Sequence, residues 1–271
     1  MIQKAFAEKA AEILKNDSSV LGLAVAGSWL TNEIDEFSDL DLILVTRERI
    51  SNNKGRMLEY AKTLGQLLSA FTGEHVNEPR LLICLYDDPL LHVDIKFLTI
   101  EEFDKQIEIP VIISDEGGQL RAAVNKTKAE FPYPEYQWIE DRFWTWIHYV
   151  LLKIGRGEYL EALDFFGFLR MVVFGPLLHI KNGNLPRGVR KVETQLADID
   201  LVQLKRTIAS YDKQSLIDAV ENSVKLYQSL RNELFNSIAF QRAAEEKVIA
   251  YLQYIKLQKS IARPQATPKF K

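Results

Sequence analysis

The residues best suited to chemistry are two aspartates, Asp39 and Asp41, which flank one leucine at the start of an apolar run. Residues two apart in a strand point to the same face, so the two carboxylates lie side by side while Leu40 turns into the core. Like charges this close repel each other unless a cation lies between them. Carboxylate oxygens suit Mg²⁺, which takes one or two carboxylates together with substrate phosphates. The spacing therefore predicts a magnesium site where this strand begins.

A Gly-Ser pair, Gly27-Ser28, lies at the end of another short apolar run, and Asp39 follows Gly27 by 12 residues. Glycine has no side chain, so a phosphate can approach its backbone closely. Ser28 adds a hydroxyl donor, and a helix start at this point would aim backbone N–H groups at an anion. The pair is therefore a candidate nucleotide-phosphate site.

A third carboxylate, Asp94, lies in the alternating segment His-Val-Asp-Ile-Lys. By the same alternation, His92, Asp94 and Lys96 share one face of a strand, and the apolar residues between them share the other. If this strand lies beside the strand of Asp39 and Asp41, Asp94 completes an acidic triad. Lys96 is then the phosphate-binding cation available within the same part of the chain.

The order Gly-Ser, Asp-x-Asp in an apolar strand and a later lone Asp resembles the nucleotidyltransferase superfamily with the DNA polymerase beta-like fold. The string Ser-Asp-Leu-Asp-Leu at 38–42 is a close match, and the resemblance covers about residues 20–100. In layout, the helical second half resembles the bundle of aminoglycoside and lincosamide nucleotidyltransferases. Many members carry a basic residue in the loop after Gly-Ser. This chain has Trp-Leu-Thr-Asn at 29–32 instead, which leaves the triphosphate contacts to other residues.

The resemblance implies an enzyme that transfers a nucleoside monophosphate from a nucleoside triphosphate (NTP) to a hydroxyl of a small-molecule acceptor, either antibiotic-like or unknown. Asp39 and Asp41 would hold one or two Mg²⁺ ions. Asp94 would complete a two-metal site or act as general base on the acceptor. In an antibiotic-type enzyme, a carboxylate of the helical half contacts the acceptor, and Glu161 is the candidate here. The alternative for Glu161 is an exposed helix face paired with Lys and Arg.

Charge differs between the two halves of the chain. Residues 1–125 hold 12 Lys and Arg against 21 Asp and Glu, a net of −9, whereas residues 126–271 hold 22 against 16, a net of +6. The basic half can supply cations for a triphosphate. Arginine binds phosphate in a bidentate manner, which favours Arg187 and Arg190 of the loop Pro-Arg-Gly-Val-Arg-Lys as phosphate ligands. A solvated basic loop is the alternative.

The elements that position these residues change type near residue 125. Before it, helical stretches mix with short apolar runs that predict strands, so the expected module at 1–125 is a mixed sheet with flanking helices. The expected strands are 20–26, 40–45, 81–86, 91–98 and 110–114, and the expected helices are 3–15 and 55–71. After it, the periodicity is helical, and a bundle is expected over 126–262 followed by a disordered tail at 263–271. The expected bundle helices are 135–154, 158–180, 201–210, 213–237 and 239–260. The fold class is therefore α+β.

Composition excludes several other classes. A single cysteine, Cys84, rules out an intramolecular disulfide framework and a Cys-rich zinc site. No apolar run approaches the ~20 residues of a bilayer span. The first 16 residues form an amphipathic helix and not a signal peptide, so a cytoplasmic protein of unknown oligomeric state is expected. A net charge of −3 argues against extended nucleic acid and a membrane surface as partners.

Two alternatives to a small-molecule enzyme stay open. One is a non-catalytic nucleotide-binding or regulatory protein on the same fold, which the missing basic residue after Ser28 permits. The other is a toxin–antitoxin-type nucleotidyltransferase acting on RNA or protein. The spacing Arg142-x5-His148 resembles that of small helical RNA-cutting domains, which are often linked to nucleotidyltransferases as toxin and antitoxin; a helix-face or core histidine is the alternative for His148. The acidic first half counts against an RNA substrate.

Overall fold

The computed structural model describes residues 1–105 and 107–258, which belong to two compact units. Met1–Phe131 is hereafter the sheet unit, and Pro132–Lys271 is the helical unit. The boundary suggested by the sequence pattern, at residue 125, falls a few residues earlier. The tail expected to be disordered, 263–271, lies outside the described residues.

The sheet unit contains one mixed six-stranded sheet with strand order β3-β4-β5-β2-β1-β6. The pairing of β2 with β5 is parallel, and the other pairings are antiparallel. The strands are β1 (Val20–Val25), β2 (Leu40–Thr46), β3 (Gln66–Gly73), β4 (Glu78–Asp87), β5 (Leu91–Leu98) and β6 (Val111–Asp115). All five segments that the sequence predicted as strands are strands.

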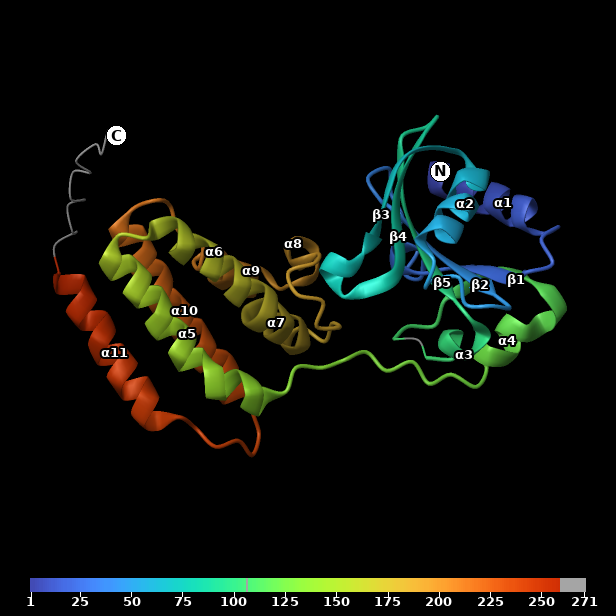
Figure 1. Cartoon of the computed structure of the whole chain (residues 1–271). Coiled ribbons are helices and arrows are strands. Elements are labelled where there is room, and N and C mark those ends of the chain that lie inside the picture. Colours follow the sequence, from blue (N-terminus) through green and yellow to red (C-terminus); the bar gives the residue numbers. More distant parts are fainter. Residues whose placement is uncertain (106, 259–271) are drawn as a thin grey trace, which may run out of the picture. The chain divides into compact units, whose positions relative to one another are not determined.

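Helices cover both faces of this sheet. On one face α1 (Ile2–Leu14) and α2 (Lys54–Leu64) enclose the larger core, and on the other α3 (Ile100–Phe103) and α4 (Gln119–Val124) enclose a smaller one (Figure 1). Three single turns complete the unit, η1 (Gly27–Trp29), η2 (Glu74–Val76) and η3 (Glu116–Gly118). The smaller core gathers around Leu98, Phe103 and Leu120 and does not include the β3 and β4 side of its face.

The register sorts the strand side chains into rows, because paired residues point to the same face of a sheet. One row lies in or against the larger core, and it consists of Ala70, Cys84, Val93 and Leu40. The next row along the strands points to the opposite face, and it consists of Phe71, Ile83, Asp94 and Asp41. The face away from α1 and α2 thus carries two carboxylates at the middle of the sheet and apolar side chains toward its β3 edge.

One expected helix is wrong in its second half. The sequence predicts a helix over 55–71, whereas α2 ends at Leu64 and, after Gly65, the chain continues as β3. The apolar residues Leu64, Leu67, Leu68 and Phe71 repeat at helical spacing, which explains the error. Most of β3 pairs with β4, and this pairing supplies the backbone hydrogen-bond partners that stabilise the segment as a strand.

The helical unit is built around three long helices, α5 (Tyr136–Arg156), α10 (Lys213–Leu234) and α11 (Arg242–Leu257), which pack side by side (Figure 1). Its other elements are α6 (Tyr159–Leu169), the π-helical turn η4 (Arg170–Phe174), α7 (Gly175–Lys181), α8 (Val192–Gln195) and α9 (Asp198–Lys205). The single helix expected over 158–180 is therefore interrupted by a π turn. Together the two units confirm the α+β class, with a mixed sheet followed by a helical part.

The segment Tyr159–Lys181 is long and apolar enough to cross a membrane by length and composition, and its most apolar 18-residue stretch has a mean hydropathy of 1.5. The expectation that no such run exists was therefore too strict. Half of that stretch is buried inside the protein, and the buried residues of the segment include Phe166, Phe174 and Leu177. The core helix of a soluble protein has the same properties.

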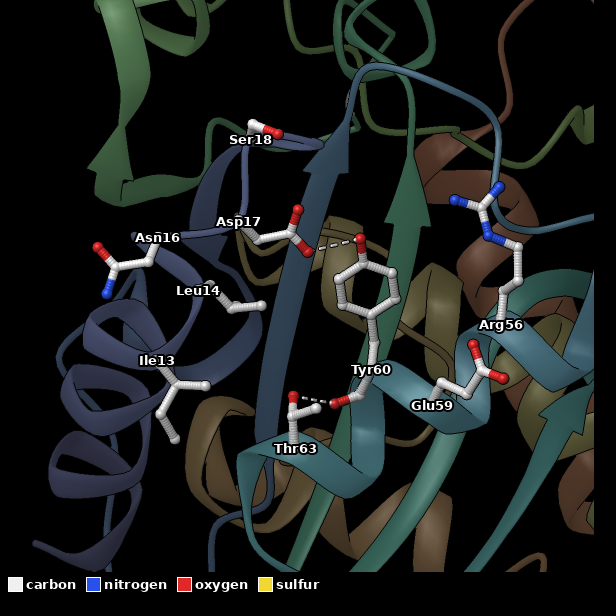
Figure 2. Close-up of a pocket in the computed structure, with 9 residues that line it drawn as sticks. All are labelled: Ile13, Leu14, Asn16, Asp17, Ser18, Arg56, Glu59, Tyr60 and Thr63. Atoms are coloured by element: carbon white, nitrogen blue, oxygen red, sulfur yellow. Dashed lines mark hydrogen bonds between the residues drawn. The ribbon is translucent and has the colours of Figure 1, made fainter.

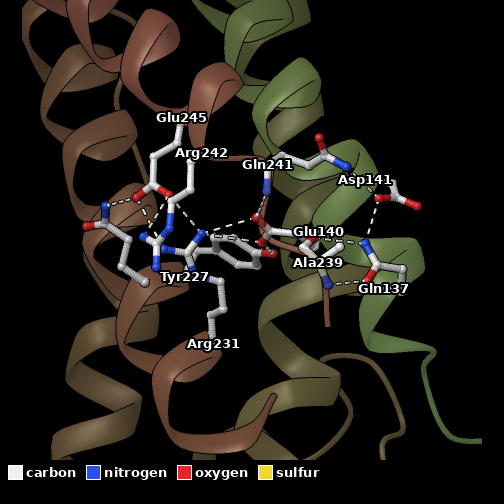
Figure 3. Close-up of polar contacts among 10 residues, drawn as sticks. Gln137, Glu140, Asp141, Tyr227, Arg231, Ala239, Gln241, Arg242 and Glu245 are labelled. Atoms are coloured by element: carbon white, nitrogen blue, oxygen red, sulfur yellow. Dashed lines mark hydrogen bonds and ion pairs between the residues drawn. The ribbon is translucent and has the colours of Figure 1, made fainter. Parts of the chain in front are cut away.

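A buried ionic network joins the long helices. Arg231 of α10, which is 2% exposed, lies between Glu140 of α5 and Glu245 of α11 (Figure 3). Its guanidinium donates to Glu140 at 3.2 Å and to Glu245 at 2.9 Å and 3.2 Å. Tyr227 donates its hydroxyl to Glu140, and the backbone N–H of Gln241 donates to the same carboxylate at 2.9 Å. The network ties α11 and the segment before it to the rest of the bundle.

Candidate active site

The parallel pairing of β2 with β5 places Asp41 directly opposite Asp94. Neighbouring strands are about 4.8 Å apart, so the two side chains leave the sheet next to each other on the same face. Both residues are partly exposed, whereas Leu40 and Leu42 point to the other face and are buried. The adjacency that the sequence left conditional is thus present for Asp41 and Asp94.

Gly27 lies against the carboxylate of Asp41. The backbone N–H of Ala26 donates to the Asp41 carbonyl at 3.0 Å, which brings the end of β1 beside the start of β2. Gly27 then has φ +63°, in the left-handed region that favours glycine, and begins η1. A Cβ at this position would lie 1.9 Å from Oδ2 of Asp41. Only glycine fits here without moving the carboxylate, and Ser28 follows in the same turn.

Asp39 comes one residue before β2, so the sheet register does not hold it as it holds Asp41. Within residues 1–105 and 107–258, no three or more His, Cys, Asp and Glu side chains gather into a group that could hold a metal ion. The fold therefore assembles a pair of carboxylates, Asp41 and Asp94, with Asp39 beside the beginning of the strand. Such a pair suits Mg²⁺, which completes its shell with phosphate oxygens and water.

His92 contacts Asp94, and the sequence analysis assigned it no role. Its Nε2 atom lies 2.9 Å from Oδ1 of Asp94, and both residues share the exposed face of β5. The strand alternation already placed the two on one face, but only the side-chain conformation brings them into contact.

Lys96 lies on the same face as Asp94, two residues further along β5. Its ammonium group is 2.9 Å from Glu78. The hydrogen bond from Arg80 lowers the pKa of Glu78 to about 2; burial opposes this shift and Lys96 adds to it. Glu78 is therefore ionised at neutral pH and holds Lys96, so a phosphate would have to compete with Glu78 for this cation.

The candidate acceptor carboxylate, Glu161, belongs to α6 of the helical unit. It accepts a hydrogen bond from the Tyr149 hydroxyl and lies 3.0 Å from the ammonium group of Lys153. The Tyr149 hydrogen bond, followed by the Lys153 hydrogen bond, lowers the pKa of Glu161. These are the contacts of an ion-paired helix surface, the alternative weighed for this residue.

Arg187 and Arg190 lie in the loop between α7 and α8 of the helical unit. The Arg190 side chain is exposed, and its backbone carbonyl lies 2.9 Å from Nε2 of His179. Arg187 is half-buried and close enough to His179 that its charge, after burial, lowers the pKa of that imidazole. Both arginines stay predicted phosphate ligands.

Trp29, which follows Gly27-Ser28, and His148 of α5 have ordinary packing contacts. The Trp29 ring packs against the larger core of the sheet unit, with the Lys4 ammonium 5.7 Å from its centroid. The His148 ring lies 5.0 Å from that of Tyr251.

A cavity of about 650 Å³ lies between the end of α1 and α2 (Figure 2). The Tyr60 hydroxyl donates to Asp17 at 2.9 Å across it, and Arg56 lies on its rim. Asp17 precedes β1, whereas Gly27 follows β1, so the cavity and the carboxylate pair lie at opposite ends of this strand. This cavity is therefore separate from the candidate active site.

No protein-family model matches the chain, and no curated protein sequence matches it. Among solved structures, it is similar to an aminoglycoside 6-adenyltransferase from Bacillus subtilis, with a TM-score of 0.38 and 15% identity, over 94% of this chain and 99% of that chain. It is also similar to a nucleotidyltransferase-like protein from Exiguobacterium sibiricum, with a TM-score of 0.33 and 11% identity, over 94% and 89% of the two chains. With identities this low, the function of the chain rests on its own residues.

Proposed function

We propose that this chain is a nucleotidyltransferase that moves a nucleoside monophosphate from an NTP to a hydroxyl group of a small-molecule acceptor. The observation that carries the proposal is the pairing of Asp41 with Asp94 beside Gly27. Two carboxylates on one sheet face next to an open backbone turn can hold a metal–phosphate group, and neither feature is needed for the core.

The donor set fits Mg²⁺, with Asp41 and Asp94 as ligands and Asp39 as a further one. When bound, the ion would offset negative charge on the transferred phosphate and on departing pyrophosphate. The chain itself supplies backbone approach at Gly27 and a hydroxyl donor at Ser28 for the phosphates. We include Arg187 and Arg190 as phosphate ligands and Glu161 as an acceptor contact in the same proposal.

In the transfer, the acceptor oxygen forms a bond to the α-phosphorus while the bond from that phosphorus to the pyrophosphate oxygen breaks. The proton of the acceptor hydroxyl passes to the carboxylate of Asp94, on the side of the pair away from Gly27. The products are pyrophosphate and the nucleotidylated acceptor. The residues of the chain contribute mainly position and charge, as is usual for phosphoryl-group chemistry.

Calorimetric titration of Mg-ATP tests the site in wild type and in Asp41→Asn, with Asp104→Asn as an exposed control on the same unit. We expect Asp41→Asn to weaken binding by about tenfold or more, which corresponds to about 1.4 kcal/mol, and Asp104→Asn to leave it unchanged. Unchanged binding in Asp41→Asn contradicts the site. Pyrophosphate release with a panel of hydroxyl acceptors then separates an enzyme from a non-catalytic nucleotide-binding protein, which would bind Mg-ATP without turnover.

A further inference from the structure

A second cavity, of about 410 Å³, opens beside the carboxylate pair, and we name it the Phe37 cavity. It lies between the turn before β2, the end of β4 and the start of β5. Its lining residues are Ile2, Glu36, Phe37, Ser38, Asp39, Leu85, Leu90, Leu91 and His92. Asp39 contributes to both this cavity and the proposed magnesium site, so the two adjoin.

The sheet register sets the distance between the Phe37 cavity and the carboxylates. Leu85 pairs with His92, and the next pair on the same face is Ile83 with Asp94. Two residues along a strand span about 7 Å. The His92 ring bridges part of this distance, since its Nε2 lies 2.9 Å from Asp94. A molecule of modest size seated in the cavity can therefore bring a hydroxyl group to the proposed reaction centre.

Five of the nine residues that line the Phe37 cavity are apolar, and most of these five are exposed. Phe37 is 87% exposed, Leu90 66% and Leu85 38%. Exposed apolar side chains that surround a cavity favour a ligand with an apolar body, because its binding removes their surface from water.

Hydrogen bonds from α1 and within the turn anchor the turn that carries Phe37. Gln3 of α1, which is 1% exposed, donates to the carbonyls of Asp35 and Ser38 at 2.9 and 2.7 Å. The Asp35 side chain accepts hydrogen bonds from Phe37 N–H and from the Ser38 hydroxyl, both at 2.9 Å. Phe37 and Glu36 thus project from an anchored turn, which lowers the entropy that a bound ligand would have to offset.

The ionisable groups that line the Phe37 cavity are Glu36, Asp39 and His92. Two carboxylates against one imidazole disfavour an anionic ligand and favour a cation. The sheet unit as a whole is acidic, which adds to the same preference. The cavity therefore combines an apolar wall with a negative rim.

We propose that the Phe37 cavity is the acceptor site, and that its acceptor is an amphipathic alcohol with an apolar body and one ammonium group. The assignment rests on the proposed nucleotidyl transfer. The apolar body contacts Phe37, Leu85 and Leu90, the ammonium group pairs with Glu36, and the hydroxyl points toward Asp94. A polycationic aminosugar lacks the apolar body that this wall selects.

Four probes test the assignment on the full chain by calorimetry or ligand-observed NMR. Tyramine carries a hydroxyl, a ring and an ammonium group, 4-ethylphenol lacks the ammonium group, and ethanolamine lacks the ring. Kanamycin serves as the polycation. We expect tyramine to bind about tenfold more tightly than either 4-ethylphenol or ethanolamine.

Two variants assign the contributions to residues. Glu36→Gln should reduce the affinity for tyramine about tenfold and leave 4-ethylphenol unchanged, whereas Leu90→Ser should weaken both aromatic probes. Glu8→Gln and Leu68→Ser are the matched controls, since Glu8 and Leu68 are also exposed and do not line the cavity. Both controls should bind all probes as wild type does.

Equal affinities for the three small probes, no effect of Glu36→Gln on tyramine, or tighter binding of kanamycin than of tyramine would each overturn the acceptor assignment. Mg-ATP is titrated into the same samples to keep this outcome apart from the proposed function. Nucleotide binding that depends on Asp41, without selectivity for tyramine, overturns the acceptor assignment alone. Tyramine selectivity in a chain that binds no nucleotide overturns both.

Discussion

Replacing Arg231 by Met is the most informative perturbation of the helical unit. It removes the cation that lies between Glu140 and Glu245, whose side chains are 0% and 8% exposed (Figure 3). Both carboxylates are buried. The variant therefore leaves two buried negative charges that no longer share a cation at the centre of the network.

The size of the stability loss depends on which hydrogen bonds Glu140 and Glu245 keep in the variant. Breaking a buried ion pair by removing one partner costs about 3–5 kcal/mol. Glu140 keeps its hydrogen bonds from Tyr227 and from the backbone of Gln241, and Glu245 keeps one from Gln228 at 2.7 Å. These retained hydrogen bonds favour the lower part of the range, so we expect the free energy of unfolding of the helical unit to fall by about 3 kcal/mol.

The loss should depend on pH. Burial is the largest single influence on Glu245 and raises its pKa. The hydrogen bonds from Arg231 and Gln228, together with the charges of Arg231 and Arg242, outweigh burial, so the pKa in the folded protein lies below the usual 4.5. In wild type this contribution to stability is present above about pH 4.5 and is lost as the pH falls through the folded pKa. Without Arg231, burial dominates and the pKa rises. The penalty of Arg231→Met is then largest at neutral pH and shrinks as the pH falls toward 4.5.

Urea unfolding followed by tryptophan fluorescence measures this change, since three of the four tryptophans, Trp138, Trp144 and Trp146, lie in the helical unit. Arg242→Met is the matched control, because Arg242 lies 3.7 Å from the same Glu245 but is 60% exposed, and it should cost under about 1 kcal/mol. Arg231→Lys, which keeps the charge and loses the planar fork, should fall between the two. A loss in Arg231→Met no larger than in Arg242→Met, or one that is the same at pH 7 and pH 5, would refute the reasoning.

Three further predictions concern the sheet unit. Gly27→Ala should abolish Mg-ATP binding in a chain that still folds, because its Cβ would lie 1.9 Å from Oδ2 of Asp41; calorimetry beside circular dichroism checks this, and wild-type affinity would contradict it. Cys84 is 1% exposed, and burial raises its pKa to about 12, so a thiol reagent should leave it unmodified in the native protein and modify it in urea; rapid native labelling would show that the core is open. Tyr60→Phe removes the 2.9 Å hydrogen bond to Asp17 and should cost about 1 kcal/mol at pH 7 by urea unfolding. A backbone hydrogen bond from Ser19 is the main cause that lowers the pKa of Asp17, so this loss should persist at pH 5 and shrink only below about pH 4; a loss that disappears already at pH 5 would be the contrary result.

Local pattern predicted much of the candidate site. Alternation alone placed Asp41 and Leu40 on opposite faces of β2, and the structure has Leu40 buried and Asp41 partly exposed. The glycine expected to admit a phosphate at Gly27 does occupy a backbone conformation that favours glycine. These predictions depend on residues within a few positions of one another, where strand geometry fixes the outcome.

Features that depend on distant residues could not be predicted in the same way. The helical spacing from Leu64 to Phe71 favoured a helix, whereas pairing with the distant strand β4 makes this segment the strand β3. Glu161 was singled out as an acceptor contact, whereas its contacts with Tyr149 and Lys153 come from the packing of α6 against α5. Nothing in the sequence pointed to Arg231, because its partners lie on two other helices.

The sequence by itself determined the two-part α+β organisation, the strand that begins after Asp39 and carries Asp41, and the chemical types that make a magnesium–phosphate site reasonable. Tertiary structure alone decided which carboxylate stands beside Asp41, because the parallel pairing of β2 with β5 joins segments separated by α2, β3 and β4. It also decided that Lys96 is held by Glu78 and that a cavity lined by apolar and acidic side chains opens beside the pair. The physical reason is that periodicity reports which face a side chain takes, whereas its neighbours are set by the packing of the whole sheet.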